Sequence, residues 1–185
     1  MKKARIFLSI AIPDDIKQAL AQQLRSLHHN INNAIWLDQK NWHITLAFLG
    51  EVATDTVAIL AKKIPVWVKN WQPAHLQLSE ISAFPNPYKA KIIIINSQPD
   101  KELIRLQNSL LAQLQDQQIS FDAKALHWQP HLTIGRLHKP QNLAEHIFAL
   151  NDKVRRPWRV SQLQCFSSIL EKSGSKYYLQ FNADL

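Results

Sequence analysis

The sequence places a histidine and a threonine two positions apart in two apolar stretches, NWHITLAFLG and WQPHLTIGRL. The two histidines, His43 and His131, are separated by nearly half of the 185-residue chain. The elements expected around them also recur in nearly the same order: a helix, a His-x-Thr strand, a helix and a hairpin. Because such recurrence is typical of internally repeated architectures, we expect two lobes of similar build, each contributing one of these strands.

Apolar periodicity predicts the elements of the first half. In chain order they are a strand over 4–12, a helix over 14–29, a histidine strand over 43–50, a helix from Thr54, and a hairpin of strands over 75–84 and 91–97. Gly50 is expected to end the histidine strand. Pro65 is expected to kink the second helix or to end it early, because proline lacks the backbone donor that a helix interior needs.

The second half is expected to begin with a helix whose first turn is capped by Asp100. The elements that follow are the histidine strand from His131, a helix over 143–150, and two strands over 159–169 and 176–182 that are joined around Gly174. Sequential helices and antiparallel hairpins, with few strand–helix–strand crossovers, favour an α+β fold over a doubly wound parallel sheet.

The composition is that of one globular unit. Hydrophobic residues make up 46% of the chain and charged residues 19%, and no Gly/Ser-rich or charged linker divides it, so residues 1–185 are expected to form a single domain. Cys165 is the one cysteine, which rules out an intramolecular disulfide and fits a reducing cytoplasm. No apolar run approaches the roughly 20 residues that a membrane-spanning helix needs, so no membrane partner is expected.

The formal net charge of +8 gives the chain a long-range attraction for polyanions. Nucleic acids, phosphorylated metabolites and anionic membrane surfaces all meet that description, and the charge alone does not choose among them.

Strand geometry places the motif side chains on one surface. Side chains alternate across a strand, so His43 and Thr45 share one face, and His131 and Thr133 share the corresponding face of the second strand. The intervening apolar residues face the core and hold the polar pairs rigidly. If the two lobes face each other, the two pairs converge on one cleft.

Two imidazoles and two hydroxyls suit phosphodiester cleavage. A neutral imidazole can take a proton from water while an imidazolium gives one to a leaving oxygen, because an unperturbed histidine pKa of about 6.5 populates both forms near neutrality. The hydroxyls can donate hydrogen bonds to phosphate oxygens whose charge grows in the transition state. Sequence chemistry leaves open which of His43 and His131 is the acid.

Two other chemistries fit less well. Acyl transfer lacks a nucleophilic serine or cysteine with a partner in either motif, and Cys165 lies in an apolar stretch. A zinc site lacks the His-x-His or His-x-x-x-His spacing, and the nearby carboxylates of Asp38 and Glu51 lie outside the motifs. We therefore expect no metal and no other cofactor.

At this point a resemblance is evident. HITLAF and HLTIGR resemble the paired His-x-Thr-x motifs of the two-histidine phosphoesterases, specifically the RNA 2′,3′-cyclic phosphodiesterases of the LigT/ThpR type. The opening RIFLSIAIP resembles the first strand of that family, and the similarity extends over the whole chain. The resemblance implies two α+β lobes whose antiparallel sheets and outer helices surround a central cleft. It also implies opening of a 2′,3′-cyclic phosphate at an RNA end to leave a 2′-phosphomonoester, with 2′-5′ RNA ligation as the reverse reaction.

The resemblance also assigns roles by position. His43 would give a proton to the departing 3′ oxygen, and His131 would activate water. Thr45 and Thr133 would bind phosphate oxygens. Arg136 matches a basic residue of the family, although strict alternation places it on the core face, so it reaches the phosphate only if Gly135 or the strand end breaks the pleat.

Five aromatic residues are expected near the ends of the cleft, where they either stack a base or pack in the core. They are Trp36, Trp42, Phe84, Tyr88 and Trp128. The expected partners are RNA ends or cyclic nucleotides, and the protein is expected to be a monomer. Two alternatives stay open: a non-catalytic RNA-binding protein, and a phosphodiesterase for a small cyclic phosphate that is not RNA.

Overall fold

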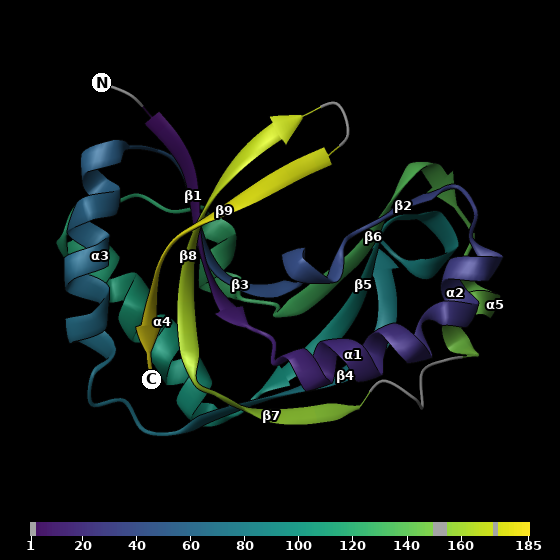
Figure 1. Cartoon of the computed structure of the whole chain (residues 1–185), viewed down its shortest axis with the longest axis horizontal. Helices are drawn as coiled ribbons and strands as arrows, with labels where there is room; N and C mark the ends of the chain where they lie inside the picture. The colour runs from purple at the N-terminus through teal and green to yellow at the C-terminus, as the bar shows by residue number, and fades with distance from the viewer. Residues whose placement is uncertain (1–2, 150–154, 172–173) are drawn as a thin grey trace.

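The computed structural model describes residues 3–149, 155–171 and 174–185, and in them a curled antiparallel sheet is covered by helices (Figure 1). The strands are β1 Lys3–Ala11, β2 Ala34–Trp36, β3 His43–Ala53, β4 Ala74–Phe84, β5 Ala90–Pro99, β6 His131–Gln141, β7 Arg156–Val160, β8 Gln162–Glu171 and β9 Gly174–Asp184. The helices are α1 Asp14–Gln23, α2 Arg25–Asn30, α3 Thr54–Val68, α4 Lys101–Asp116 and α5 Ala144–Phe148, with 3₁₀ turns η1 Gln39–Asn41, η2 Pro87–Lys89 and η3 Ala123–His127. The predicted α+β class is confirmed.

The strand order has two halves of matching plan. The sheet runs β7-β4-β5-β6-β3-β1-β8-β9, and β2 pairs with β6 outside this path. From the centre outward, one half is therefore β3, β1, β8 and β9, and the other is β6, β5, β4 and β7. Each half has its His-x-Thr strand at the centre, where β3 and β6 meet through the pair Ile44–Leu132. Both halves belong to one continuous sheet.

The core lies between this sheet and the helices. Ile6, Leu8 and Ile10 of β1 are fully buried, as are Ile93 and Ile95 of β5. The predicted apolar stripe of α4 is buried as well, and its members are Leu103, Leu106, Leu110 and Leu114. Full burial of such a side chain stabilises the fold by roughly 1.5–3 kcal/mol, so this core holds the central strands in a fixed position.

The predicted end of the first histidine strand is wrong, and one of the two alternatives expected at Pro65, an early end of the helix, is excluded. Gly50 does not end the histidine strand: β3 continues to Ala53, and Gly50 takes a positive φ of 71° at an irregularity in the pairing with β1. Pro65 does not end the second helix, which runs to Val68. Ile64 and Val68 are buried on either side of the proline, and their packing offsets the backbone hydrogen bond that proline cannot make.

The strand predicted over 159–169 is instead two strands in different halves of the sheet. The chain leaves β7 at Val160 and enters β8 at Gln162, so Ser161 separates them. β7 pairs with β4, whereas β8 pairs with β1. Both strands are half-buried, and alternation of apolar and polar residues along one segment cannot reveal that its partner strand changes. The helix predicted over 143–150 covers Ala144–Phe148, and Leu150 lies outside the described residues.

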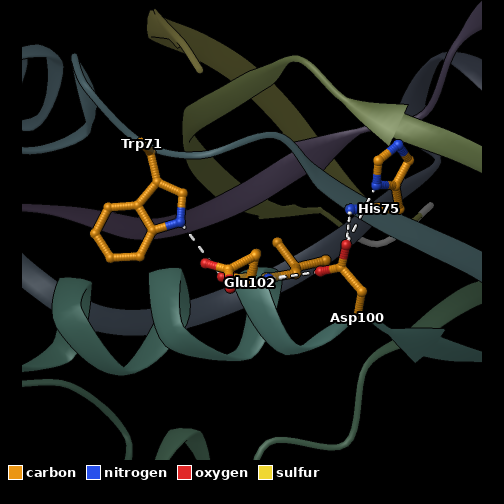
Figure 2. Close-up of polar contacts among 5 residues, drawn as sticks. Trp71, His75, Asp100 and Glu102 are labelled. Carbon is orange, nitrogen blue, oxygen red and sulfur yellow. Dashed lines mark hydrogen bonds and ion pairs between the residues drawn. The ribbon is translucent and has the colours of Figure 1, made fainter.

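Asp100 fastens α4 to the sheet, as Figure 2 shows. Its Oδ1 accepts the predicted capping bond from the backbone N–H of Leu103 at 2.8 Å. Its Oδ2 accepts from the backbone N–H of His75 at 2.7 Å and lies 3.3 Å from Nδ1 of the same residue. Nearby, the indole N–H of Trp71 donates to the carbonyl oxygen of Glu102 at 3.3 Å. One carboxylate therefore links the start of β4 to the first turn of α4.

None of the helices in the described part of the chain is both long and apolar enough to cross a membrane.

Candidate active site

The two histidines begin their strands in the same way. Nδ1 of His43 lies 2.7 Å from the carbonyl oxygen of Asn41, and Nδ1 of His131 lies 2.8 Å from that of Gln129. A carbonyl oxygen only accepts hydrogen bonds, so each Nδ1 carries a hydrogen and donates it. In the neutral ring Nε2 is then the atom that can accept a proton. The chain fixes the same tautomer and ring direction at both sites by a bond to the residue two positions earlier.

Strand pairing brings the two motifs together. Ile44 and Leu132 form an antiparallel pair at the centre of the sheet, and both side chains are fully buried. The residues on either side of them, which include the histidines, face the opposite surface of the sheet. One cavity of about 230 Å³ on this surface is lined by all five residues that the sequence singled out: His43, Thr45, His131, Thr133 and Arg136.

A bulge in β6 explains how Arg136 reaches this cavity. Thr133 is opposite Ile94 of β5, but Gly135, and not Ile134, is opposite Ile93. The extra residue shifts the alternation by one position, so that Arg136 is exposed on the face that carries Thr133. Of the two conditions under which Arg136 was expected to reach the phosphate, a break in the pleat at Gly135 or at the strand end, the first is met.

β3 contains the equivalent bulge, but it delivers a different side chain. Thr45 is opposite Ser9 of β1, and Ala47 is opposite Leu8, so one residue is again inserted. Phe48, five positions after His43, therefore enters the cleft where the other motif has Arg136. The guanidinium of Arg5 lies 4.8 Å from the centre of the Phe48 ring, a cation–π arrangement. A second arginine thus lines the cleft from β1.

Aromatic rings enclose His43 much more than His131. Phe7 stacks on the imidazole at 4.8 Å between ring centres, and Tyr177 meets it edge-on at 5.3 Å. This burial lowers the pKa of His43 to about 4, although the hydrogen bond to Asn41 acts in the opposite direction, and the nearby His131 lowers it further. His43 is consequently neutral in the unliganded protein near pH 7. His131 is half-exposed and has one edge-on contact, with Phe84 at 5.0 Å.

Hydrogen bonds from outside the cleft hold the two motifs in place. The indole N–H of Trp128 donates to the carbonyl oxygen of Thr45 at 2.8 Å. The segment that precedes the second motif is therefore bonded to the backbone of the first. Ser97 of β5 donates from its hydroxyl to the carbonyl oxygen of Pro130 at 2.9 Å. Each bond acts through the backbone, so the site geometry depends on residues that do not line the cavity.

The five aromatic residues expected near the cleft have different positions. None of them lines the cavity that contains both histidines. Trp36 lines an adjoining groove, Trp42 is buried and bonds the carbonyl of Leu37, Phe84 packs on His131, Tyr88 is exposed on η2, and Trp128 supports Thr45.

Sequence reasoning missed several residues that do line the cavity. They are Arg5, Phe7, Leu37, Phe48, Ser168, Ser175 and Tyr177. The sequence could have grouped Arg5 with Phe7, because side chains alternate along a strand and these two therefore lie on the same face of β1. Ser168, Ser175 and Tyr177 had no such signal, since the pairing of β8 with β1 brings that hairpin to the cleft and no local pattern indicates this pairing.

Cys165 takes no part in the site. Its side chain is fully buried, and burial raises the pKa of the thiol to about 12. Within residues 3–149, 155–171 and 174–185, no group of three or more His, Cys, Asp or Glu side chains is placed to hold a metal ion. Two arginines, Arg5 and Arg136, line the cavity beside the two histidines.

A curled antiparallel sheet with paired His-x-Thr strands on one face defines a two-histidine phosphoesterase. The family model described as the 2′-5′ RNA ligase superfamily matches residues 12–169, and the chain belongs to that family. The chain is 26% identical to the RNA 2′,3′-cyclic phosphodiesterase of Archaeoglobus fulgidus, over 94% of this chain and 96% of the relative. It is 27% identical to the protein of the same name from Methanocaldococcus jannaschii, again over 94% and 96%.

Solved structures share the fold. E. coli LigT in its apo form aligns with a TM-score of 0.68 at 20% sequence identity, covering 100% of this chain and 99% of LigT. A protein of Thermus thermophilus, TT0787, aligns with a TM-score of 0.71 at 17% identity, covering 98% and 97%. The fold prediction is therefore confirmed over essentially the whole chain.

Proposed function

We propose that the protein hydrolyses the 2′,3′-cyclic phosphodiester of RNA ends to a 2′-phosphomonoester, with His43 and His131 as the proton-transfer groups. The observation that carries the proposal is the matched pair of imidazoles, each with Nδ1 bound to the carbonyl two residues earlier and both lining one cavity. The names of the relatives, RNA 2′,3′-cyclic phosphodiesterases, support the choice of substrate.

The reaction needs one base and one acid. Water attacks phosphorus while one neutral histidine takes its proton at Nε2, the bond from phosphorus to the 3′ oxygen breaks, and the other histidine protonates that oxygen. The family resemblance makes His131 the base and His43 the acid. Since His43 is neutral in the free protein near pH 7, its acid role requires that the bound anionic phosphate raise its pKa and bring a proton onto the ring.

The remaining polar groups of the cavity suit the phosphate. The hydroxyls of Thr45 and Thr133 can donate to its non-bridging oxygens, and the guanidinium of Arg136 can offset the charge that grows on them. Arg5 adds a second positive charge. If a 5′-hydroxyl replaces water as the attacking group, the same proton transfers break the bond to the 3′ oxygen and form a 2′-5′ phosphodiester, which accounts for reversible 2′-5′ ligation.

The proposed setting is a monomer in the cytoplasm. The buried thiol of Cys165 supports a reducing compartment.

Of the alternative substrates, a cyclic phosphate outside RNA uses the same chemistry, and comparing its turnover with that of RNA oligomers distinguishes the two.

The proposal is tested by incubating the protein with 2′,3′-cyclic AMP in EDTA and following the phosphorus NMR signal. We expect the cyclic phosphate resonance to be replaced by that of a 2′-phosphomonoester. If the ring stays closed at every pH while the nucleotide still binds, the protein is a non-catalytic binding protein. A 3′-phosphomonoester product would show that the wrong phosphorus–oxygen bond had been assigned.

A further inference from the structure

A second groove adjoins the catalytic cavity. It has a volume of about 300 Å³ and lies between the segment that carries β2 and η1 and the beginning of β9. Its lining comprises Ile35, Trp36, Leu37, Asp38, Lys40, Asn41, Arg136, Ser175, Lys176 and Tyr177. Leu37, Arg136, Ser175 and Tyr177 also line the catalytic cavity, so the two spaces share a boundary. A chain that leaves the reacting phosphate can pass over this boundary into the groove.

The sizes of the surrounding cavities favour this direction. Small-molecule sites usually enclose about 300–1,000 Å³. The catalytic cavity, at about 230 Å³, lies below this range and leaves no room for a second nucleotide beside the terminal one. Another cavity lined by His43 measures about 80 Å³ and is too small for a nucleotide. A larger cavity beside α1 and α2, lined by Gln18 and Arg25 among others, shares no lining residue with the catalytic cavity.

Two aromatic side chains flank the groove in fixed positions. The indole of Trp36 lies against Gly135, so closely that a Cβ atom there would come within 2.9 Å of the ring. The imidazole of His28 packs on the same indole at 4.1 Å between ring centres. Tyr177 is held edge-on against His43 and Phe7. Rigid aromatic faces of this kind stack nucleobases without preference for sequence.

The charge of the groove suits a nucleic acid backbone. Lys40, Lys176 and Arg136 contribute three cationic groups, and Asp38 is the one carboxylate among the lining residues. The ammonium of Lys40 lies 2.9 Å from Oδ2 of Asp38, and this contact holds the pKa of the carboxyl below its usual range. The groove therefore keeps a net positive charge beside an apolar wall that includes the 41% exposed Ile35.

We propose that this groove binds the nucleotide preceding the cyclic-phosphate nucleotide, so that an oligonucleotide end is hydrolysed with a higher kcat/KM than a cyclic mononucleotide. The inference rests on the proposed function and adds a subsite that selects for RNA length. Trp36 and Tyr177 provide the stacking surfaces for the base, and Arg136, at the boundary of the two spaces, faces the connecting phosphodiester.

The test compares two substrates, 2′,3′-cyclic AMP and a triadenylate that ends in a 2′,3′-cyclic phosphate. Ile35→Gln and Lys40→Glu alter the groove at residues that do not line the catalytic cavity, and the first adds no charge beside Arg136, its partner in the pairing of β2 with β6. Lys139→Glu, an exposed position on β6 outside both spaces, is the matched charge-reversal control. We expect the wild type to favour the oligomer by at least roughly tenfold, given the usual contribution of stacking and phosphate contacts.

Both groove variants should lose most of that preference while they turn over the mononucleotide at the wild-type rate. The preference should also fall as salt is raised. Equal kcat/KM for both substrates in the wild type would overturn the subsite and leave the proposed function intact. An equal loss on both substrates in the two variants would place the terminal base in the groove and overturn the inference. Hydrolysis of neither substrate by the wild type would instead reject the proposed function.

Discussion

Ile44 of β3 and Leu132 of β6 form the antiparallel pair that joins the two halves of the sheet. Both side chains are fully buried, and each lies between the histidine and the threonine of its motif. This buried pair therefore also places the two imidazoles on the same surface of the sheet. Because the backbones are fixed at this pair, the position of each histidine depends on the core beneath it and on its own bond to a backbone carbonyl.

Removal of either imidazole tests the acid–base assignment. His43→Ala and His131→Ala should each lower kcat/KM on 2′,3′-cyclic AMP by about 10²- to 10⁴-fold, since each removes one proton-transfer group. His138→Ala, at an exposed position on β6 that does not line the cavity, is the control and should retain wild-type activity. Near-normal turnover by a folded His43→Ala or His131→Ala protein would show that the substituted residue does not transfer a proton.

The pH dependence of kcat/KM should reflect the enclosure of His43. This parameter reports the free enzyme, whose reactive form holds one proton on the pair of histidines. The lower pKa of the pair, that of His43 at about 4, therefore sets the acid limb of a bell-shaped profile. Phe7→Ala removes the ring stacked on the imidazole and should move that limb upward, toward the ordinary histidine pKa of about 6.5. NMR titration of the His43 ring provides a direct measurement of the same shift.

The control for this profile is Phe148→Ala, which truncates an exposed phenylalanine on α5 and should leave the limb near pH 4. Folding must be monitored by circular dichroism, because the unfolded chain binds the His43 proton more tightly than the folded one. Stability is therefore lost as pH falls from about 6.5 to about 4. An acid limb that does not move in Phe7→Ala would mean that burial by Phe7 is not the cause of the low pKa.

Local pattern was sufficient to predict that the motif side chains share one surface. Period-two alternation placed His43 with Thr45 and His131 with Thr133, and all four line one cavity. The capping role of Asp100 was likewise evident from a polar residue directly before an apolar periodic segment. In these cases the determining interactions lie within a few residues of one another along the chain.

What the sequence could not reveal depends on strand partners. Arg5, Ser168 and Tyr177 reach the cleft because β1 lies between β3 and β8 and because β9 follows β8, and this order is a property of the whole sheet. The strand predicted over 159–169 divides at Ser161 for the same reason, because β7 and β8 pair with strands in different halves of the sheet. Bulges were anticipated only at Gly135, where glycine signals one; the matching insertion between Thr45 and Ala47 contains no glycine.

Asp100 should contribute to stability and leave catalysis unaffected. Asp100→Ala removes both the cap of α4 and the acceptor for the backbone of His75, and it should lower the free energy of unfolding by about 1–3 kcal/mol. Asp100→Asn keeps an oxygen for the cap and should cost less. Urea denaturation measures both, with Asp116→Ala at the far end of α4 as control. A large loss of kcat/KM in folded Asp100→Ala would contradict this separation, because Asp100 does not line the cavity.

Substitution by alanine should destabilise the protein at both Gly135 and Gly50, for different reasons. At Gly135 an added Cβ would lie 2.9 Å from the Trp36 indole, which is itself held by His28, so the ring or the strand must move. Overpacking of this kind typically costs about 1–3 kcal/mol. Since Arg136 follows directly, kcat/KM on 2′,3′-cyclic AMP should fall as well.

At Gly50 no atom lies within 4 Å of an added Cβ, and the cost comes from the positive φ of 71°, which an L side chain adopts at about 1–2 kcal/mol. Gly50 does not line the cavity, so Gly50→Ala should lose stability and retain activity. Urea denaturation, tryptophan fluorescence and kcat/KM together distinguish the two variants. Gly135→Ala, which acts on Trp36, should change the summed emission of the six tryptophans more than Gly50→Ala does. If both glycine variants lost activity in proportion to stability alone, the packing of Trp36 on Gly135 would have no specific role in positioning Arg136.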